Sequence, residues 1–185
     1  METKTQWIYR KDGEKVRYVL GEMLDTKQAK SLICIGINPS TATPEALDTT
    51  LKRVQAYAKS NGYGAWYMLN VYPQRETDPN KMDKVKNEEI IIENLDEIKE
   101  LTKTIDSADV WCAWGASINK RGYLRDCLRD IIDHLQTKKG YRFVQKIPMD
   151  NRSTSHPLHP IASIKCKAKL GDFDINNYLK NIKNQ

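Results

Sequence analysis

The chain has 185 residues, of which 39% are hydrophobic and 29% are charged, a composition typical of a soluble globular protein. No apolar segment approaches the roughly 20 residues that a membrane-spanning helix needs, so the sequence argues against an integral membrane protein. The net charge of +6 favours a polyanionic partner, nucleic acid or a nucleotide, with a merely solvated basic surface as the alternative.

The start of the chain is polar, and the four cysteines are widely separated. Residues 1–6 lack the apolar segment of a secretion signal, which predicts a cytoplasmic protein. No cysteine pair or cysteine–histidine pair has the spacing of zinc ligands, so we expect no metal site. Cys34 and Cys112 lie in apolar runs, where a reduced cysteine acts as a small hydrophobic residue.

The predicted elements alternate between strands and helices. The Asp12-Gly13 turn predicts an N-terminal β-hairpin within residues 6–21, because Asp-Gly supplies the positive φ of a tight turn. Apolar runs and helical spacing then predict strands at 31–37, 65–71, 108–114 and 141–144, and helices at 46–60, 84–103, 117–137 and 172–182.

This alternation predicts one domain over residues 1–185, with an α/β core at 30–164 and a C-terminal helix at 172–182. The economical architecture is a three-layer α/β sandwich around a mostly parallel four-stranded sheet, accompanied by the hairpin. The oligomeric state does not follow from the sequence.

The expected strands end in polar segments. Parallel sheets bind ligands at the carboxyl ends of their strands, so we expect these segments to meet in one crevice. They contribute Asn38, Pro39, Ser40 and Thr41 after the first strand, Asn70, Tyr72 and Arg75 after the second, Trp114 and Gly115 after the third, and His156, Leu158 and His159 from the loop at 148–163.

Two asparagines and a histidine are the candidate functional groups of this crevice. Asn38 and Asn70 each offer a donor and an acceptor, the pair that reads the edge of an amide or a nucleobase, although turn capping is the alternative. His156 precedes a proline, so a rigid loop holds an imidazole that can stabilise negative charge or transfer a proton. A surface histidine without a role is the alternative.

The hydroxyl groups of Ser40, Thr41 and Thr43 lie just ahead of the helix expected at residue 46. They fit a phosphate at the helix N-terminus and helix capping equally well. The segment lacks the glycines of a P-loop or a dinucleotide-binding motif, and we expect no cofactor.

Four of these segments occur in an order that resembles the uracil-DNA glycosylase superfamily. They are Gly36-Ile37-Asn38-Pro39, Met68-Leu69-Asn70, Trp114-Gly115 and His156-Pro157-Leu158. More closely, residues 17–160 resemble the bacterial and phage domain-of-unknown-function family 1643. That resemblance rests on Asn38-Pro39-Ser40-Thr41-Ala42, Asp48-x-Thr50 with Arg53, Gly62-Tyr63-Gly64, the run from Asn70 to Pro79, Trp114-Gly115 and His156-Pro157-Leu158.

The resemblance implies a glycosylase-like fold and a nucleobase-recognising protein that hydrolyses an N-glycosidic bond in nucleic acid or a nucleotide. In that scheme Asn70 reads the base, Asn38 orients water and His156 stabilises the departing base. An amide has no useful proton affinity, so Asn38 is not a general base. Basic side chains are expected to hold phosphates, namely Lys120, Arg121, Lys165 and Lys167.

Two alternatives come from other functional classes. The first is a non-catalytic pocket that binds or sequesters a nucleotide, a modified nucleoside or a nucleotide signal, which needs the same asparagines but no oriented water. The second is a fold retained as a protein-interaction module, which predicts no response to these ligands.

Overall fold

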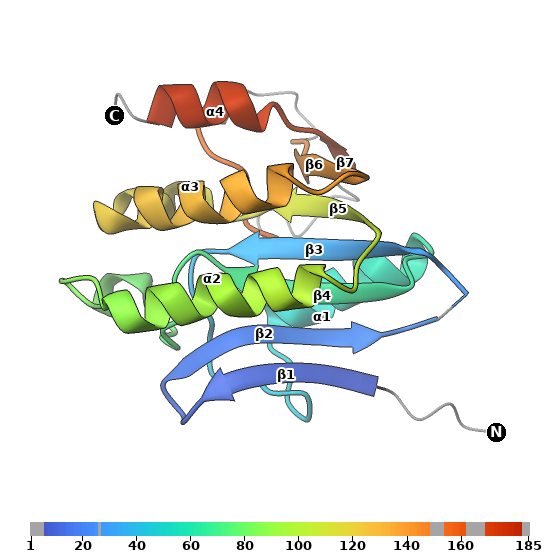
Figure 1. Cartoon of the computed structure of the whole chain (residues 1–185), viewed down its shortest axis with the longest axis horizontal. Coiled ribbons are helices and arrows are strands. Elements are labelled where there is room, and N and C mark those ends of the chain that lie inside the picture. The colour runs from blue at the N-terminus through green and yellow to red at the C-terminus, as the bar shows by residue number, and fades with distance from the viewer. Residues whose placement is uncertain (1–5, 26, 149–153, 162–168, 183–185) are drawn as a thin grey trace.

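The computed structural model describes residues 6–25, 27–148, 154–161 and 169–182. One seven-stranded sheet crosses the molecule in the order β1-β2-β4-β3-β5-β6-β7 (Figure 1). Its strands are β1 (Gln6–Asp12), β2 (Val16–Met23), β3 (Lys30–Gly36), β4 (Ala65–Asn70), β5 (Ser107–Cys112), β6 (Tyr141–Lys146) and β7 (Leu170–Asp172). The helices are α1 (Thr49–Ser60), α2 (Glu88–Thr102), α3 (Tyr123–Gln136) and α4 (Ile175–Ile182), and the short 3₁₀ turns are η1 (Pro79–Lys81) and η2 (Gly115–Asn119).

The four strands expected from the apolar runs form the parallel centre of the sheet, β4-β3-β5-β6. The predicted size of four strands is wrong, because antiparallel strands extend both sides. The hairpin joins through β2 and β4, where Leu20 pairs with Met68. On the other side, β7 pairs with β6 through only three residues, too short a segment for a periodic pattern to reveal.

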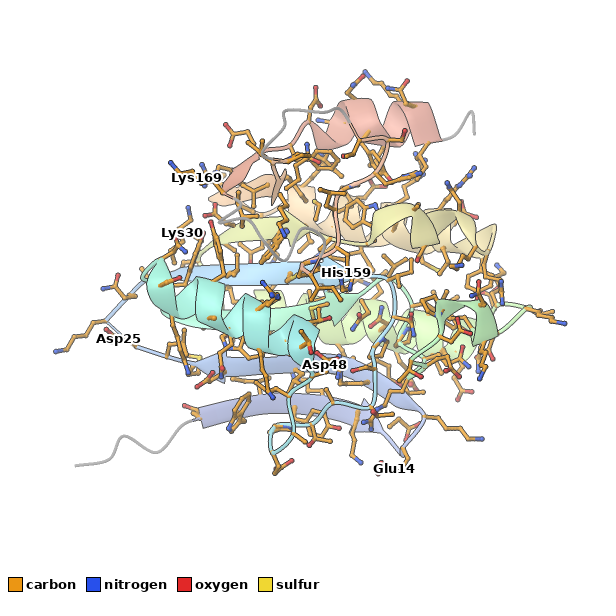
Figure 2. The ribbon with its side chains drawn as sticks, turned by 180° about the vertical axis from the view of Figure 1, so that it is seen from behind. Glu14, Asp25, Lys30, Asp48, His159 and Lys169 are labelled. Carbon is orange, nitrogen blue, oxygen red and sulfur yellow. The ribbon has the colours of Figure 1, made fainter. Side chains whose placement is uncertain are left out.

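Helices cover both faces of the sheet, which makes three layers. Helix α1 packs on one face through Leu51, Val54 and Ala58, as the view from behind shows (Figure 2). Helices α2, α3 and α4 cover the opposite face and bury the second hydrophobic core (Figure 1). The α/β sandwich expected from the alternation of elements is therefore present. Within the described ranges, no helix combines the length and the hydropathy needed to cross a membrane.

The helices begin later than their apolar spacing suggests. Helix α1 begins at Thr49 instead of residue 46, because the Asp48 side chain accepts a hydrogen bond from the Leu51 N–H (2.8 Å) and caps the helix. Asn87 caps α2 in the same way, so that helix starts at Glu88. The segment expected to begin a helix at residue 117 forms the separate turn η2, and α3 follows from Tyr123.

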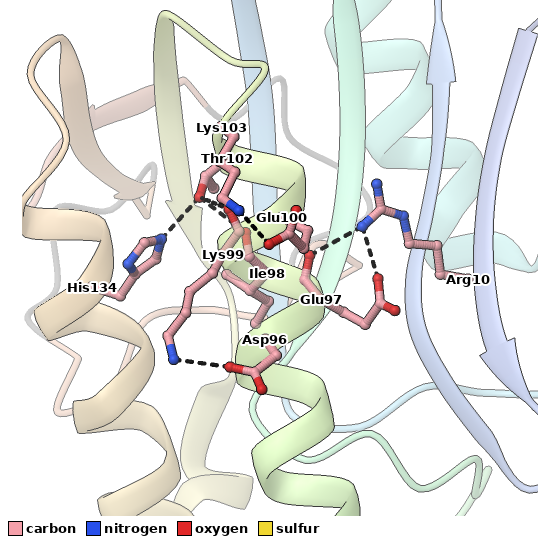
Figure 3. Close-up of polar contacts among 9 residues, drawn as sticks. All are labelled: Arg10, Asp96, Glu97, Ile98, Lys99, Glu100, Thr102, Lys103 and His134. Atoms are coloured by element: carbon pink, nitrogen blue, oxygen red, sulfur yellow. Dashed lines mark hydrogen bonds and ion pairs between the residues drawn. The ribbon is translucent and has the colours of Figure 1, made fainter.

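Polar contacts hold α2 against its neighbours on both sides (Figure 3). Arg10 of β1 donates to the Glu97 carboxylate (2.7 Å) and to the Glu97 carbonyl (3.3 Å). On the other side, the Thr102 hydroxyl lies 2.8 Å from Nε2 of His134 in α3. These contacts complement the apolar packing under α2.

Gly64 is the closest point of contact between the β2–β3 connection and the start of β4. A Cβ at this position would lie 2.1 Å from the Gln28 carbonyl oxygen and 2.8 Å from that of Asp25. The Gly64 carbonyl also accepts from the N–H groups of Leu24 (2.8 Å) and Asp25 (3.0 Å). Only a glycine permits this approach of two backbones.

We therefore expect Gly64→Ala to lower the free energy of unfolding by about 2 kcal/mol or more, because rigid backbone must move. The control is Gly122→Ala, where a Cβ meets nothing within 4 Å and φ is −58°. That variant should match the wild type or gain up to about 1 kcal/mol. Urea unfolding measures both, and equal stability of the two variants would show that the close approach is not a constraint.

Candidate ligand-binding site

A cavity of about 530 Å³ lies at the carboxyl ends of β3, β4 and β5. This volume fits a small organic ligand. Three strand ends contribute to its wall, and so do the start of α1 and the segment at 154–161. Figure 2 shows Asp48 and His159 on the side of the sheet that α1 covers. The lining includes Arg17, Gly36, Asn38, Ser40, Thr41, Asp48, Met68, Asn70, Trp114, Gly115 and His159.

Asn70, the last residue of β4, has a side chain without hydrogen bonds. The residue is 0% exposed, and neither Oδ1 nor Nδ2 has a partner in the described part of the chain. Its backbone carbonyl accepts a hydrogen bond from Nδ2 of Asn94 (3.0 Å), so the missing hydrogen bonds are those of the side-chain amide. A buried polar group without a partner costs about 1–3 kcal/mol. Such a group at a cavity wall is placed where a ligand or a water can supply the missing bonds.

Gly36 leaves room for this amide. It pairs with Asn70 across β3 and β4. A Cβ on Gly36 would lie 3.1 Å from Oδ1 of Asn70 and 2.6 Å from Cε of Met68. The glycine that ends the first apolar run therefore keeps the Asn70 amide from being crowded.

Arg17 brings a buried positive charge to the cavity. It is 2% exposed, its Nη1 donates to the Ala42 carbonyl (3.0 Å), and its Nε has no partner among the described residues. Burial lowers the pKa of Arg17 to about 10, against the opposing effect of Asp48. The guanidinium group remains charged at neutral pH.

Asp48 combines two structural contacts with a place in the cavity wall. One oxygen caps α1, and the other accepts from the Ser40 hydroxyl (2.6 Å). The Ser40 Oγ in turn accepts from the Ala42 N–H (3.2 Å). Ser40 is thus engaged in holding the loop, while the cap of α1 comes from Asp48.

Asn38 uses its amide nitrogen to tether a neighbouring loop. Nδ2 donates to the carbonyls of Glu76 (2.6 Å), Gln74 (3.3 Å) and Pro39 (3.3 Å). Its donors are therefore occupied, and Oδ1 is the atom left to accept a hydrogen bond from a ligand or a water. The sequence places Asn38 in the crevice, and the structure adds this tethering role.

His156 lines a neighbouring hollow of about 550 Å³, together with Leu158, and not the cavity of Asn70. Its Nε2 lies 3.0 Å from Nδ2 of Asn119 and its Nδ1 lies 2.9 Å from the Tyr178 hydroxyl. Arg125 donates to Oδ1 of Asn119 (2.9 Å), so the Asn119 amide nitrogen faces His156 and donates to Nε2. This network assigns the ring proton to Nδ1.

Both ring nitrogens of His156 are therefore engaged within the fold. The Tyr178 hydroxyl also accepts from Nε1 of Trp114 (2.9 Å), which links the histidine to the buried indole. Burial, followed by the charge of Arg125, lowers the pKa of His156 and favours the neutral ring. Its expected role toward a departing base stays a prediction.

His159 is the histidine that lines the same cavity as Asn70, and it also borders the neighbouring hollow. Its Nδ1 accepts from the Ile161 N–H (3.4 Å). Burial lowers the pKa of His159, and the charge of Asp48 opposes that shift. Gly115, with φ of +62°, donates to the Pro157 carbonyl (2.9 Å) and so fixes this loop at the end of β5.

Several residues expected in the crevice support its walls from outside. Arg75 donates to the carbonyls of Ser40 (3.1 Å) and Thr41 (2.5 Å). Pro39 is buried, and its carbonyl accepts from the Glu76 N–H (2.8 Å). Tyr72 is fully buried, and its hydroxyl donates to Asp83 (2.7 Å) beside the ring of Tyr123.

Two of the four expected phosphate-binding residues, Lys120 and Arg121, belong to the described part of the chain, and neither lines the cavity. Lys120 bonds to Oδ1 of Asn80, and Arg121 donates to the carbonyls of Asn80 (2.7 Å), Met82 (2.8 Å) and Asp83 (3.0 Å). Both thus hold the segment around η1. Lys165 and Lys167 lie outside the described residues, so their role stays a prediction.

Arg17 is a cavity residue that the sequence did not single out, whereas Asp48 was noted near the strand ends and in the Asp48-x-Thr50 motif but was given no role in the site. Arg17 could have been noticed as the one charged residue in the otherwise apolar run 16–20. Asp48 could have been recognised as an N-cap in front of a helix. The polar groups of the cavity wall thus include the Asn70 amide, the Arg17 guanidinium, the Asp48 carboxylate and the His159 imidazole. In the described ranges no group of three or more His, Cys, Asp or Glu side chains has the arrangement of a metal site.

Comparisons with known proteins give one family and one weak structural similarity. A family model described as "Protein of unknown function (DUF1643)" matches residues 17–161, a range that contains every residue lining the cavity. No curated protein matches the chain. A solved β-glucosidase from Erythrobacter marinus has 14% sequence identity and a TM-score of 0.33, with 82% of this chain and 24% of that chain covered. The chain thus spans about a quarter of that enzyme, and so low a TM-score carries no argument.

The tethering role of Asn38 predicts the effect of a nearly isosteric substitution. Asn38→Asp places a carboxylate against the carbonyls of Glu76 and Gln74, so we expect a loss of about 2 kcal/mol in the free energy of unfolding at neutral pH. The repulsion raises the pKa of the new carboxyl in the folded state. The loss is therefore complete above that pKa and shrinks as the pH falls toward about 4, where the unfolded state is also protonated.

Chemical unfolding at neutral and acidic pH measures this effect relative to the wild type. The exposed substitution Asn181→Asp is the control, because among the described residues the Asn181 side chain bonds only to Asn177 on the same helix. A loss for Asn38→Asp that is no larger than the control's, or that does not change with pH, would rule out the tether.

Proposed function

The chain belongs to the DUF1643 family of proteins of unknown function, and we propose that its cavity recognises a nucleobase through Asn70. The observation that carries this proposal is the amide of Asn70, which is fully buried at the cavity wall and whose two polar atoms have no hydrogen bond to any described residue. The proposal assigns those two missing hydrogen bonds to the ligand.

The geometry of a primary amide supports a base as the ligand. Asn70 offers a donor and an acceptor side by side, which matches a carbonyl next to an N–H on the edge of a base. A good bidentate pair of this kind is worth about 1–3 kcal/mol of discrimination. The remaining wall includes Met68 and Trp114, which supply the apolar surface that a planar ring needs.

Hydrolysis of an N-glycosidic bond is a second candidate function. It is favoured by acceptor atoms in the same cavity, because the Asp48 carboxylate and Oδ1 of Asn38 can both accept hydrogen bonds from water. Of these two, only Asp48 has the proton affinity of a base. His156 lies in the neighbouring hollow with both ring nitrogens engaged, whereas His159 lines the cavity.

Isothermal titration with uridine, thymidine, cytidine, adenosine and guanosine tests the proposal. We expect the wild type to bind one class of base and Asn70→Ala to lose about tenfold or more in affinity for it, since the bidentate pair is removed. Asn181→Ala, an exposed asparagine, is the matched control and should bind as the wild type does. Failure of the wild type to bind any nucleoside or nucleotide, or undiminished binding by Asn70→Ala, would refute base recognition by Asn70.

Chromatography of the same mixtures separates the two candidate functions. Free base that accumulates with the wild type and not with Asn70→Ala would establish hydrolysis. Binding without a product would leave a non-catalytic nucleobase pocket.

A further inference from the structure

We propose that Arg17 is a second recognition residue of the cavity and binds the phosphate of a mononucleotide. This inference rests on the proposed base recognition by Asn70 and names the ligand class more narrowly. The two residues would bind different parts of the same ligand. Asn70 would select the base, and Arg17 would bind the phosphate.

The burial of Arg17 is the first argument. A fully buried arginine is rare unless it is paired, because removing its charge from water is costly. Arg17 is 2% exposed, and the charge of Asp48 acts on it, yet no carboxylate of the described residues forms an ion pair with its guanidinium. The Ala42 carbonyl accepts from one nitrogen, and the buried Nε has no partner among the residues that the structure describes. An anion in the cavity would supply the missing charge and the missing hydrogen bond.

The position of Arg17 is the second argument. Its backbone N–H donates to the Pro73 carbonyl (3.0 Å), three residues after Asn70, so both residues lie at the same edge of the sheet. Both side chains line the same cavity. A ligand with a base at one end and an anionic group at the other can therefore contact Asn70 and Arg17 together.

The other cationic groups near the cavity are already engaged. Arg75 holds the loop carbonyls of Ser40 and Thr41, and Arg121 holds carbonyls around η1. Of the lysines and arginines in the described segments, Arg17 is the one that lines the cavity. The anionic part of a ligand would therefore be directed to Arg17.

Two carboxylates also line the cavity and limit where a phosphate fits. Asp48 accepts from Ser40 and from the Leu51 N–H, and Glu76 accepts from the Asp78 N–H (3.1 Å). These donors partly compensate the two negative charges. The charge of Asp48 acts on Arg17, so a phosphate at Arg17 would lie near this carboxylate, and the hydrogen bonds that Asp48 already accepts would reduce the repulsion there. The hydroxyls of Thr50 and Ser117, which also line the cavity, have no hydrogen bond in the described part of the chain and are further donors for its oxygens.

The burial of Arg17 favours a free mononucleotide over a nucleic-acid strand. A group that is 2% exposed is reached by a ligand that enters the cavity as a whole. The phosphates of a continuous strand are expected to follow exposed basic side chains along a surface.

The test compares each nucleoside with its 5′-monophosphate by isothermal titration. We expect the wild type to bind the monophosphate about tenfold or more tightly than the nucleoside, the size of effect typical of a hydrogen bond to a charged group. In Arg17→Met this gain should disappear, while the affinity for the nucleoside changes little. Arg17→Lys should keep part of the gain, because it keeps the charge and loses the planar set of donors.

The ratio of the two affinities separates recognition from a structural role. Arg17 also holds the Ala42 carbonyl, so Arg17→Met can lower the thermal stability, but a structural loss weakens both ligands alike. Lys139→Met, at an exposed lysine that does not line the cavity, is the control for the loss of one positive charge and should leave the ratio unchanged. A wild type that binds both ligands equally, or an Arg17→Met variant that keeps the gain, would overturn the inference.

The possible failures are distinguishable. Nucleoside binding that depends on Asn70 but gains nothing from the phosphate would overturn the role of Arg17 and leave base recognition intact. No binding of either ligand would refute both. If a short single-stranded oligonucleotide binds more tightly than the monophosphate, and if this binding depends on Arg17, the phosphate belongs to a nucleic acid. That result would overturn the inference that the ligand is a free mononucleotide.

Discussion

The parallel pairing of β3 with β4 is the constraint on which the candidate site depends. It sets Gly36 opposite Asn70 and continues beyond both strands, because the N–H groups of Val71 and Tyr72 donate to the carbonyls of Gly36 and Ile37 (both 2.9 Å). The backbone of Asn70 is therefore fixed on both sides. A slip of one residue would turn its side chain to the opposite face of the sheet. With the register fixed, the amide stays buried at the cavity wall, and the fold supplies no partner for it among the described residues.

The polar residues around Asn70 divide into those that build the walls and those that are left for a ligand. Asn38 tethers the loop at 74–76, Arg75 holds the loop at 40–41, and Asp48 caps α1. The contacts of Asn38 and Arg75 join a side chain to the backbone of a loop, and that of Asp48 joins one to the first turn of α1, so each fixes a wall. Asn70 and Arg17 differ because each has buried polar atoms that no described residue hydrogen-bonds. That difference, more than residue type, separates the residues proposed for recognition from the supporting ones.

The central sheet could be predicted because its strands are buried on both faces and appear as continuous apolar runs. The predicted helix starts were less accurate, because the apolar spacing extends to residues before Asp48 and Asn87. The side chains of these two residues cap the helices, so each helix begins at the next residue. The strand ends that carry Asn38, Asn70, Trp114 and Gly115 were predicted to meet, and the cavity lining brings them together. Arg17 could not be predicted in this way, because its proposed role comes from burial without an ion pair among the described residues, which depends on the tertiary structure.

The central claim is that the amide of Asn70 is kept for a ligand at a cost to the fold. Its most direct test is the free energy of unfolding of Asn70→Leu without ligand, measured by urea denaturation beside nucleoside binding. Leucine has a similar shape and removes a buried, unbonded polar group, so the account predicts a gain of about 1 kcal/mol in stability together with loss of binding. A loss of about 2 kcal/mol or more would contradict the account, because it would mean that the amide is already bonded within the fold.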